Sequence, residues 1–306
     1  MMSRLTGIVP PMVTPLLDRD HLDVAGLERL LEHILAGGVN GLFILGTTGE
    51  GPSLSYHLRQ ELIERVCWQV NGRVPVLVGI TDTAFVESIQ LAGQAAASGA
   101  SALVLAPPYY LPEAQPELQE YLDHLVPELP LPLFLYNMPA LTKVSFELDT
   151  IRRALQEPRI IGFKDSSGDL TYFKAVAELI QERPDWSLLM GPEEKLLASL
   201  QLGGHGGVSG GANLFPKLYV RVVAAHQAGD LAAAAAWQQV IQRVSDSFYR
   251  IGKYSSSIIK GIKCALACQG ICDDFMAEPF HRFRAAEREL VQARLRELAA
   301  ELSQLN

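Results

Sequence analysis

Lys164 is the residue in this sequence with the clearest need of a chemical explanation. It follows the apolar or small residues 160–163, and burying a lysine charge costs several kcal/mol unless the charge is paired or neutralised. One explanation is a structural ion pair with the adjacent Asp165. The other is a nucleophilic amine that attacks a ketone, because apolar surroundings disfavour the ammonium form. Lowering a lysine pKa from about 10.4 to near neutrality takes about 3 units, or about 4 kcal/mol.

Residues suited to moving protons stand at the ends of other apolar runs. Tyr136, in YNMP at 136–139, could transfer protons at the carbinolamine that precedes an imine. Thr47, in GTTGEG at 46–51, and Tyr110, in PPYY at 107–110, could carry the proton to solvent. Taken singly, GTTGEG could be a helix-capping turn, and the tyrosines of PPYY could simply cover part of the protein surface. Their joint occurrence with GPEE at 191–194 and GGHGGVSGGAN at 203–213 favours a shared site.

Eight short apolar runs, with amphipathic segments between them, must position these residues. Continuous apolar strands that alternate with helices indicate an α/β fold and favour a (β/α)8 TIM barrel, whose active site lies at the C-terminal ends of the strands. An open doubly wound sheet is the alternative, although no G-x-G-x-x-G follows the first run. The predicted strands are residues 7–13, 41–46, 75–80, 102–107, 132–137, 160–165, 187–191 and 206–210.

The helical period is clearest in residues 24–35, before a stop at Gly37 and Gly38. After about residue 211 the predicted strands end and only helical segments follow. We therefore expect a barrel over residues 1–225, which carries the active site, and a C-terminal helical extension over residues 226–306. The other clear helices are predicted at 55–70, 84–98, 116–126, 169–182 and 193–202.

The composition, with 48% hydrophobic and 20% charged residues among 306, is that of an ordinary globular protein. A net charge of −8 with interspersed basic residues argues against a nucleic-acid partner. The sequence has no run of about 18 apolar residues and no signal-like apolar segment, so we expect no membrane partner and a cytoplasmic location. Cys264, Cys268 and Cys272 recur every four residues, which would place them on one helix face and favours core packing over a metal site.

Phosphate binding by the glycine-rich run 203–213 is disfavoured, because no lysine or arginine lies between Leu196 and Pro216. Tight packing or close backbone approach explains these glycines better. We expect neither a cofactor nor a metal, since an imine on lysine is itself the electron sink.

The order of these motifs resembles the pyruvate-dependent class I aldolases typified by dihydrodipicolinate synthase and N-acetylneuraminate lyase, over essentially the whole chain. The resemblance implies that Lys164 forms the Schiff base and that Tyr136, in Y-N-x-P, is the acid/base residue. It implies that Thr47 and Thr48, in G-[TS]-[TS]-G-E, bind the pyruvate carboxylate, with Thr47 also in a proton relay. It further implies that Tyr110 enters the neighbouring subunit's site and completes that relay, so we expect at least a dimer, and the family commonly forms dimers of dimers.

Several positions bear on the substrate. The synthases usually carry an arginine two residues after the proline of Y-N-x-P, where this sequence has Leu141, which resembles the P-A-L-S of sialic acid lyases. Glu193 and Glu194 lie where those lyases have an Asp-Glu pair that resembles a clamp for sugar hydroxyls. The alternative is structural, because two acids after a proline also make a good helix start. Gly191, just before the pair, and Val208, in the eighth strand, are the remaining expected substrate contacts.

These features predict a Schiff-base-forming aldolase or lyase that acts on pyruvate or another 2-oxo acid together with an aldehyde. We expect its substrate to be a 2-keto-3-deoxy sugar acid or a sialic-acid-like compound. Condensation of pyruvate with aspartate semialdehyde is the alternative. A barrel that binds a ligand without turnover is a third possibility, disfavoured because only chemistry needs Lys164, Tyr136 and Thr47 together.

Overall fold

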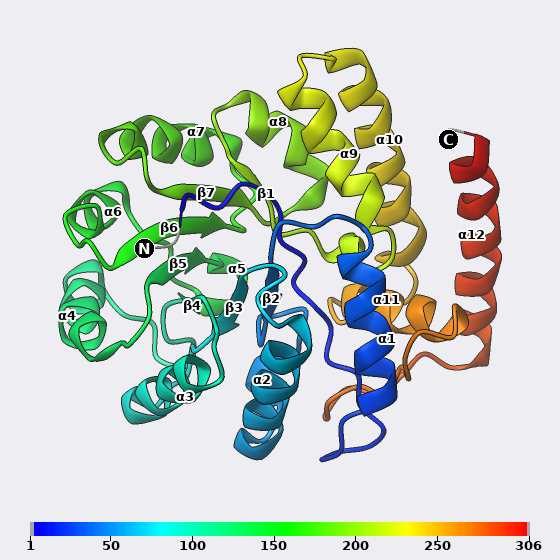
Figure 1. The fold of residues 1–306 in the computed structure, drawn as a ribbon, viewed down its shortest axis with the longest axis horizontal. Coiled ribbons are helices and arrows are strands. Elements are labelled where there is room, and N and C mark those ends of the chain that lie inside the picture. The colour runs from blue at the N-terminus through cyan, green and yellow to red at the C-terminus, as the bar shows by residue number, and fades with distance from the viewer. Residues whose placement is uncertain (1–2, 305–306) are drawn as a thin grey trace.

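Eight parallel strands form one sheet in the computed structural model, which describes residues 3–304 and the side chains of residues 3–300. The strand order is β1-β8-β7-β6-β5-β4-β3-β2, and a bridge between Pro11 and Phe43 joins the two ends. The sheet is thus curled into the predicted TIM barrel, with helices around it (Figure 1). The strands are β1 Gly7–Ile8, β2 Leu42–Ile44, β3 Val76–Gly79, β4 Ala102–Leu105, β5 Leu133–Asn137, β6 Ile160–Asp165, β7 Ser187–Met190 and β8 Gly206–Gly207.

The strands read as continuous apolar runs because both of their faces are buried. Alternate residues point inward, and these form a small cluster that is distinct from the larger core between sheet and helices. Tyr136 belongs to the inner cluster, so its phenol lies inside the barrel. The other buried members are Leu5, Val9, Phe43, Leu77, Ala102, Val104, Ala106, Phe134, Leu189 and Val208.

The barrel helices begin where the sequence supplies capping side chains. Asp23, Ser55 and Asp169 each accept hydrogen bonds from backbone amides in the first turn of the following helix. The predicted helices 55–70, 84–98 and 116–126 agree with the structure to within one residue at each end, whereas α5 and α6 were not predicted. The bounds are α1 Val24–Leu35, α2 Tyr56–Val70, α3 Phe85–Ala97, α4 Gln115–Leu125, α5 Pro139–Thr142, α6 Leu148–Ala154, α7 Leu170–Leu179, α8 Leu196–Gln201 and α9 Pro216–Gln227.

The C-terminal helices are α10 Leu231–Phe248, α11 Ser257–Cys268 and α12 Ala285–Gln304. They form a layer on one side of the barrel, where α10 packs against α9 and α12 packs against α10 and α11 (Figure 1). Helix α9 spans residue 225, the expected end of the barrel. None of the helices in the described part of the chain is long and apolar enough to cross a membrane.

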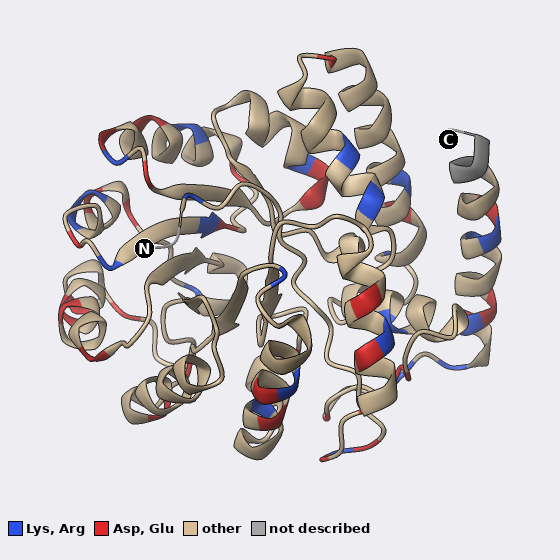
Figure 2. Ribbon diagram, viewed as in Figure 1, with Lys and Arg blue, Asp and Glu red and all other residues tan. Residues whose placement is uncertain are grey.

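The expectation that three thiols share one helix face is wrong for Cys272, because α11 ends at Cys268 and Gly270 then adopts a left-handed conformation with φ 74°. Cys264 and Cys272 are buried, and burial raises the pKa of each thiol to about 12. Within residues 3–304 no cluster of His, Cys, Asp or Glu side chains could hold a metal ion. In the view of Figure 2, basic and acidic residues both occur among the outer helices.

Candidate active site

Lys164 and Tyr136 lie side by side at the C-terminal ends of β6 and β5. The two residues are register partners in the parallel pairing of these strands. The Lys164 Nζ atom lies 3.8 Å from the centre of the Tyr136 ring and 4.9 Å from the centre of the Phe43 ring. Lys164 is only 5% exposed, so its amine sits beneath aromatic rings inside the barrel.

Asp165 does not form the ion pair with Lys164 that the sequence left open. Its carboxylate accepts hydrogen bonds from Asn137 Nδ2 at 2.9 Å and from the Ser167 amide and hydroxyl at 3.0 and 2.9 Å. Successive residues of a strand point to opposite faces, and Asp165 faces away from the lysine. Asn137 in turn accepts a hydrogen bond from the Phe146 amide at 3.1 Å, which fixes the outer face of this strand pair.

Burial lowers the pKa of Lys164, and the nearby Tyr136 opposes this shift without cancelling it. Burial by itself raises the pKa of Tyr136, but the Lys164 charge and hydrogen bonds with Thr47 and Ser166 outweigh it, so that the net pKa is lowered. Both directions suit chemistry near neutral pH, since a neutral amine is the nucleophile and a more acidic phenol gives up its proton more readily.

Thr47 reaches this pair from the loop after β2. Its Oγ1 lies 3.3 Å from the Tyr136 hydroxyl oxygen, so the two hydroxyls share a hydrogen bond. Thr48, the next residue, is half-buried in the same loop. The structure thus brings together Lys164, Tyr136 and Thr47, which lie far apart in the sequence.

A cavity of about 170 Å³ is lined in part by Thr47 and Tyr136, whereas Lys164 is not among the described residues that line it. Leu141 lies at its edge and is 50% exposed, while Tyr109, rather than Tyr110, is the tyrosine of the PPYY motif that lines it. Among the described residues that line this cavity, none is acidic or basic. They are Phe43, Leu45, Gly46, Thr47, Pro52, Gly79, Thr81, Val104, Ala106, Tyr109, Tyr136, Met138, Leu141 and Thr142.

Phe43, Thr81 and Ser166 lie at the site but were not predicted from the sequence. Ser166 lies two residues after Lys164, which is the spacing that places side chains on one face of a strand. A Cβ atom on Gly191 would lie 1.9 Å from Ser166 Oγ, so Gly191 must be glycine for the serine to occupy this place. The period of two could therefore have identified Ser166.

Tyr110 is 79% exposed and lies outside the described lining of the cavity in this single chain. Val208 packs inside the barrel in the same cluster as Tyr136 and Phe43. These positions leave the expected roles of Tyr110 and Val208 as predictions.

Glu193 makes its contacts within the protein. Its carboxylate accepts hydrogen bonds from the Tyr219 hydroxyl at 2.6 Å, the Tyr249 hydroxyl at 2.9 Å and the Gly211 amide at 2.8 Å. Burial raises its pKa to about 7 despite these donors. Glu194 is exposed and accepts a hydrogen bond from the Ser245 hydroxyl. Neither acid is among the described residues that line the cavity.

The model of the dihydrodipicolinate synthetase family matches residues 4–298. The chain belongs to this family. A probable 2-dehydro-3-deoxy-D-pentonate aldolase of Escherichia coli K12 is 32% identical over 272 residues, which are 88% of this chain and 89% of that protein. A 4-hydroxy-tetrahydrodipicolinate synthase of Nitrosospira multiformis is 33% identical over 240 residues, which are 78% of this chain and 79% of that protein.

Solved structures agree with this assignment. A dihydrodipicolinate synthase structure from Bacteroides thetaiotaomicron is 52% identical, with a TM-score of 0.94 over 97% of this chain and 100% of that one. The family member YagE of E. coli K12, solved in complex with pyruvate, is 28% identical, with a TM-score of 0.91 over 96% of this chain and 98% of that one. The chain is accordingly a class I, pyruvate-dependent lyase or aldolase.

Proposed function

We propose that this enzyme forms an imine between Lys164 and the ketone of pyruvate, and that it makes or cleaves a 2-keto-3-deoxy sugar acid or a sialic-acid-like compound. The observation that carries the imine step is the burial of Lys164 beneath Tyr136 and Phe43, because this burial lowers the pKa of the amine. The neutral amine attacks the ketone carbon, and loss of water from the carbinolamine gives the imine.

Tyr136 moves the protons in this proposal. It delivers a proton to the departing hydroxyl of the carbinolamine, and in the cleavage direction it takes the proton from the hydroxyl whose carbon becomes the aldehyde. Thr47, which shares a hydrogen bond with the Tyr136 hydroxyl, passes the proton onward. Thr47 and Thr48 bind the carboxylate of the 2-oxo acid, with Gly191 and Val208 beside it.

The neutral lining of the cavity supports an uncharged, hydroxylated aldehyde. Leu141 places an apolar side chain at its edge, and Thr47, Thr81, Tyr109 and Thr142 offer hydroxyls among the lining residues. A carboxylate on the aldehyde would find no lysine or arginine among the described lining residues, and a charge that leaves water without a partner is costly. Because Glu193 makes its contacts within the protein, we assign the contact with a sugar to Glu194, which is exposed and accepts a hydrogen bond from the Ser245 hydroxyl.

Condensation of pyruvate with aspartate semialdehyde is the second candidate. The 52% identity to a structure described as a dihydrodipicolinate synthase favours it. In either reaction we expect the enzyme to act in the cytoplasm, without a cofactor, and as a dimer or tetramer in which Tyr110 of one subunit completes the relay of another. The 79% exposure of Tyr110 in the single chain supports that part of the proposal.

Borohydride reduction in the presence of pyruvate tests the imine step. We expect a pyruvyl adduct on the peptide that contains Lys164, absent from Lys164→Ala and retained in the exposed-lysine control Lys174→Ala. No adduct with pyruvate or any other 2-oxo acid would refute imine catalysis. A screen of the aldehyde partner, with glyceraldehyde and N-acetylmannosamine against aspartate semialdehyde, then separates the two reactions.

A further inference from the structure

A buried ion pair joins the loop that carries Thr47 and Thr48 to the C-terminal helices. Glu50, the last residue of the GTTGE motif, accepts a hydrogen bond from Lys263 Nζ in α11 at 2.6 Å, across 213 positions in the sequence. The lysine side chain is 0% and the glutamate side chain 3% exposed. A lysine and a glutamate are almost never buried this deeply unless they are paired.

The remaining polar groups of this pair hold the loop and the segment that follows β1. Lys263 Nζ also donates to the Thr14 carbonyl oxygen at 2.8 Å, and the Thr14 hydroxyl donates to the Gly49 carbonyl oxygen at 2.6 Å. The second carboxylate oxygen of Glu50 accepts a hydrogen bond from the Ala277 amide at 2.8 Å. The loop is thus fixed from the segment after β1, from α11 and from the segment after α11.

The loop backbone has an unusual conformation that needs such support. Leu45 and Glu50, which flank it, both have left-handed backbones, with φ of 60° and 58°. Residues other than glycine adopt this conformation at a cost of about 1–3 kcal/mol, and they keep it only where the surroundings impose it. A Cβ atom on Gly51 would lie 2.2 Å from the Leu45 carbonyl oxygen, so the two ends of the loop are in close contact. The Glu50 amide donates to the Thr47 carbonyl oxygen at 3.0 Å, so a displacement of Glu50 acts directly on Thr47.

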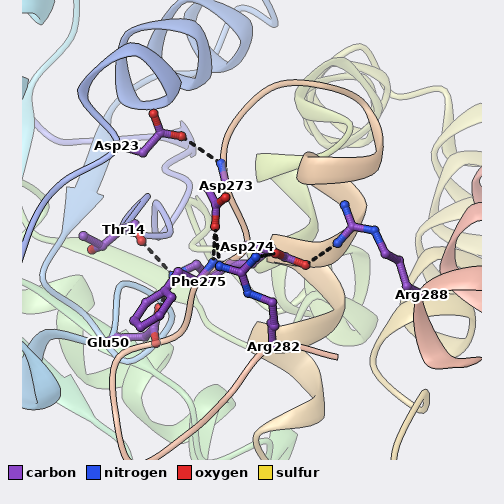
Figure 3. Close-up of polar contacts among 9 residues, drawn as sticks. Thr14, Asp23, Glu50, Asp273, Asp274, Phe275, Arg282 and Arg288 are labelled. Carbon is purple, nitrogen blue, oxygen red and sulfur yellow. Dashed lines mark hydrogen bonds and ion pairs between the residues drawn. The ribbon is translucent and has the colours of Figure 1, made fainter. Parts of the chain in front are cut away.

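The segment that supplies the Ala277 amide is anchored in turn (Figure 3). Arg282 contacts Asp273 at 2.9 Å, and Arg288 of α12 contacts Asp274 at 2.6 Å. The Asp273 amide donates to the Asp23 carboxylate at the start of α1 at 2.8 Å. The C-terminal extension thereby has a continuous polar connection to the Thr47 loop.

We propose that Lys263 is a positioning residue for the Thr47–Thr48 loop, and that the C-terminal extension acts on 2-oxo acid binding through the Lys263–Glu50 pair. This inference rests on the proposed binding of the carboxylate by Thr47 and Thr48. Replacing a buried pair by apolar groups is often neutral for stability, whereas removing one partner leaves an uncompensated buried charge. The Lys263–Glu50 pair therefore contributes more to the geometry of the Thr47–Thr48 loop than to the stability of the fold.

The test compares Lys263→Met, Glu50→Gln/Lys263→Met and the control Val291→Ala, which truncates a buried residue of α12. Each variant is scored for folding by circular dichroism, for the pyruvate concentration that half-saturates borohydride trapping at Lys164, and for KM and kcat. A misplacement of about 1 Å costs up to about 100-fold in reactivity. We expect Lys263→Met to raise the half-saturating pyruvate concentration and the pyruvate KM at least tenfold. Saturating pyruvate should still trap Lys164 in this variant. The double variant buries no charge, and we expect it to recover part of the lost pyruvate affinity. Val291→Ala should stay within about twofold.

Four results would overturn the inference. The first is a folded Lys263→Met with unchanged KM. The second is a Val291→Ala with an equal rise in KM, which would make the effect one of stability alone. The third applies if Lys263→Met does not fold: a wild-type KM in the double variant would then refute positioning by the pair. The fourth is a wild-type enzyme that gives no pyruvyl adduct. This result refutes the proposed function together with this inference, and it is recognised because it is seen before any substitution is made.

Discussion

Replacing Leu141 by arginine should shift the enzyme towards an aldehyde that carries a carboxylate. The side chain lies at the edge of a cavity whose described lining has no lysine or arginine. A hydrogen bond to a charged group contributes about 1.5–3 kcal/mol. Because Leu141 is 50% exposed, solvent screens a charge at this position, and we take the lower limit of about 1.5 kcal/mol. That free energy corresponds to about a tenfold gain in kcat/KM.

The assay follows pyruvate consumption with aspartate semialdehyde and with glyceraldehyde for the wild type, Leu141→Arg and Leu141→Gln. We expect the ratio of the two kcat/KM values to rise about tenfold for arginine only, and the gain to shrink at high salt. The glutamine variant controls for the polarity of the longer side chain without its charge. An equal change in kcat/KM for both aldehydes, or an equal gain with glutamine, would refute the idea that Leu141 lies beside the part of the aldehyde that carries the carboxylate.

Three further predictions follow from the contacts around the site. Tyr136→Phe removes the hydroxyl that we propose as proton donor beside Lys164, so kcat should fall by about 100- to 10,000-fold in a pyruvate-consumption assay, with little change in thermal stability. Burial raises the pKa of Glu193 to about 7 in the folded protein, against 4.5 for an unperturbed glutamate. The folded state therefore binds the extra proton, and the free energy of unfolding should fall by about 2–3 kcal/mol from pH 5 to pH 8. Denaturant titrations should show this loss in the wild type but not in Glu193→Gln. Asn137→Ala leaves the Phe146 amide without its partner and removes one of the donors to the Asp165 carboxylate. This should cost about 1–3 kcal/mol in urea unfolding, and an unchanged midpoint would contradict this account.

The strand ends near the site could be predicted from the sequence because they are marked locally. Strand β6 occupies the predicted residues 160–165, and β5 begins one residue after its predicted start. The first strand is much shorter than predicted, with only Gly7–Ile8 regular. Pro10 and Pro11 follow it, and proline cannot donate the ladder hydrogen bonds that would extend a strand.

Contacts between distant segments could not be predicted in this way. The four-residue spacing of Cys264 and Cys268 indicates a helix in this segment, but it does not indicate that Lys263 faces Glu50. Likewise, the two acids after Pro192 identify a helix start, and the opening of a 3-10 turn is indeed found at Glu193. This pattern does not indicate that the hydroxyls of Tyr219 and Tyr249, which are 26 and 56 residues further on, donate hydrogen bonds to Glu193. Such partners depend on how α9 and α10 pack against the barrel.

The partner of Lys164 explains why this lysine is suited to act as a nucleophile. A carboxylate within reach would favour the ammonium form and raise the lysine pKa. The adjacent Asp165 does not do so, because the β5–β6 register places it opposite Asn137, which binds its carboxylate on the outer face. Lys164 instead has the Tyr136 phenol as its polar neighbour, which opposes the lowering of the lysine pKa without cancelling it. A phenol ordinarily ionises at a much higher pH than a carboxylate. A shift of one residue in this register would exchange the two faces, bring Asp165 into the barrel and remove the neutral amine on which imine formation depends.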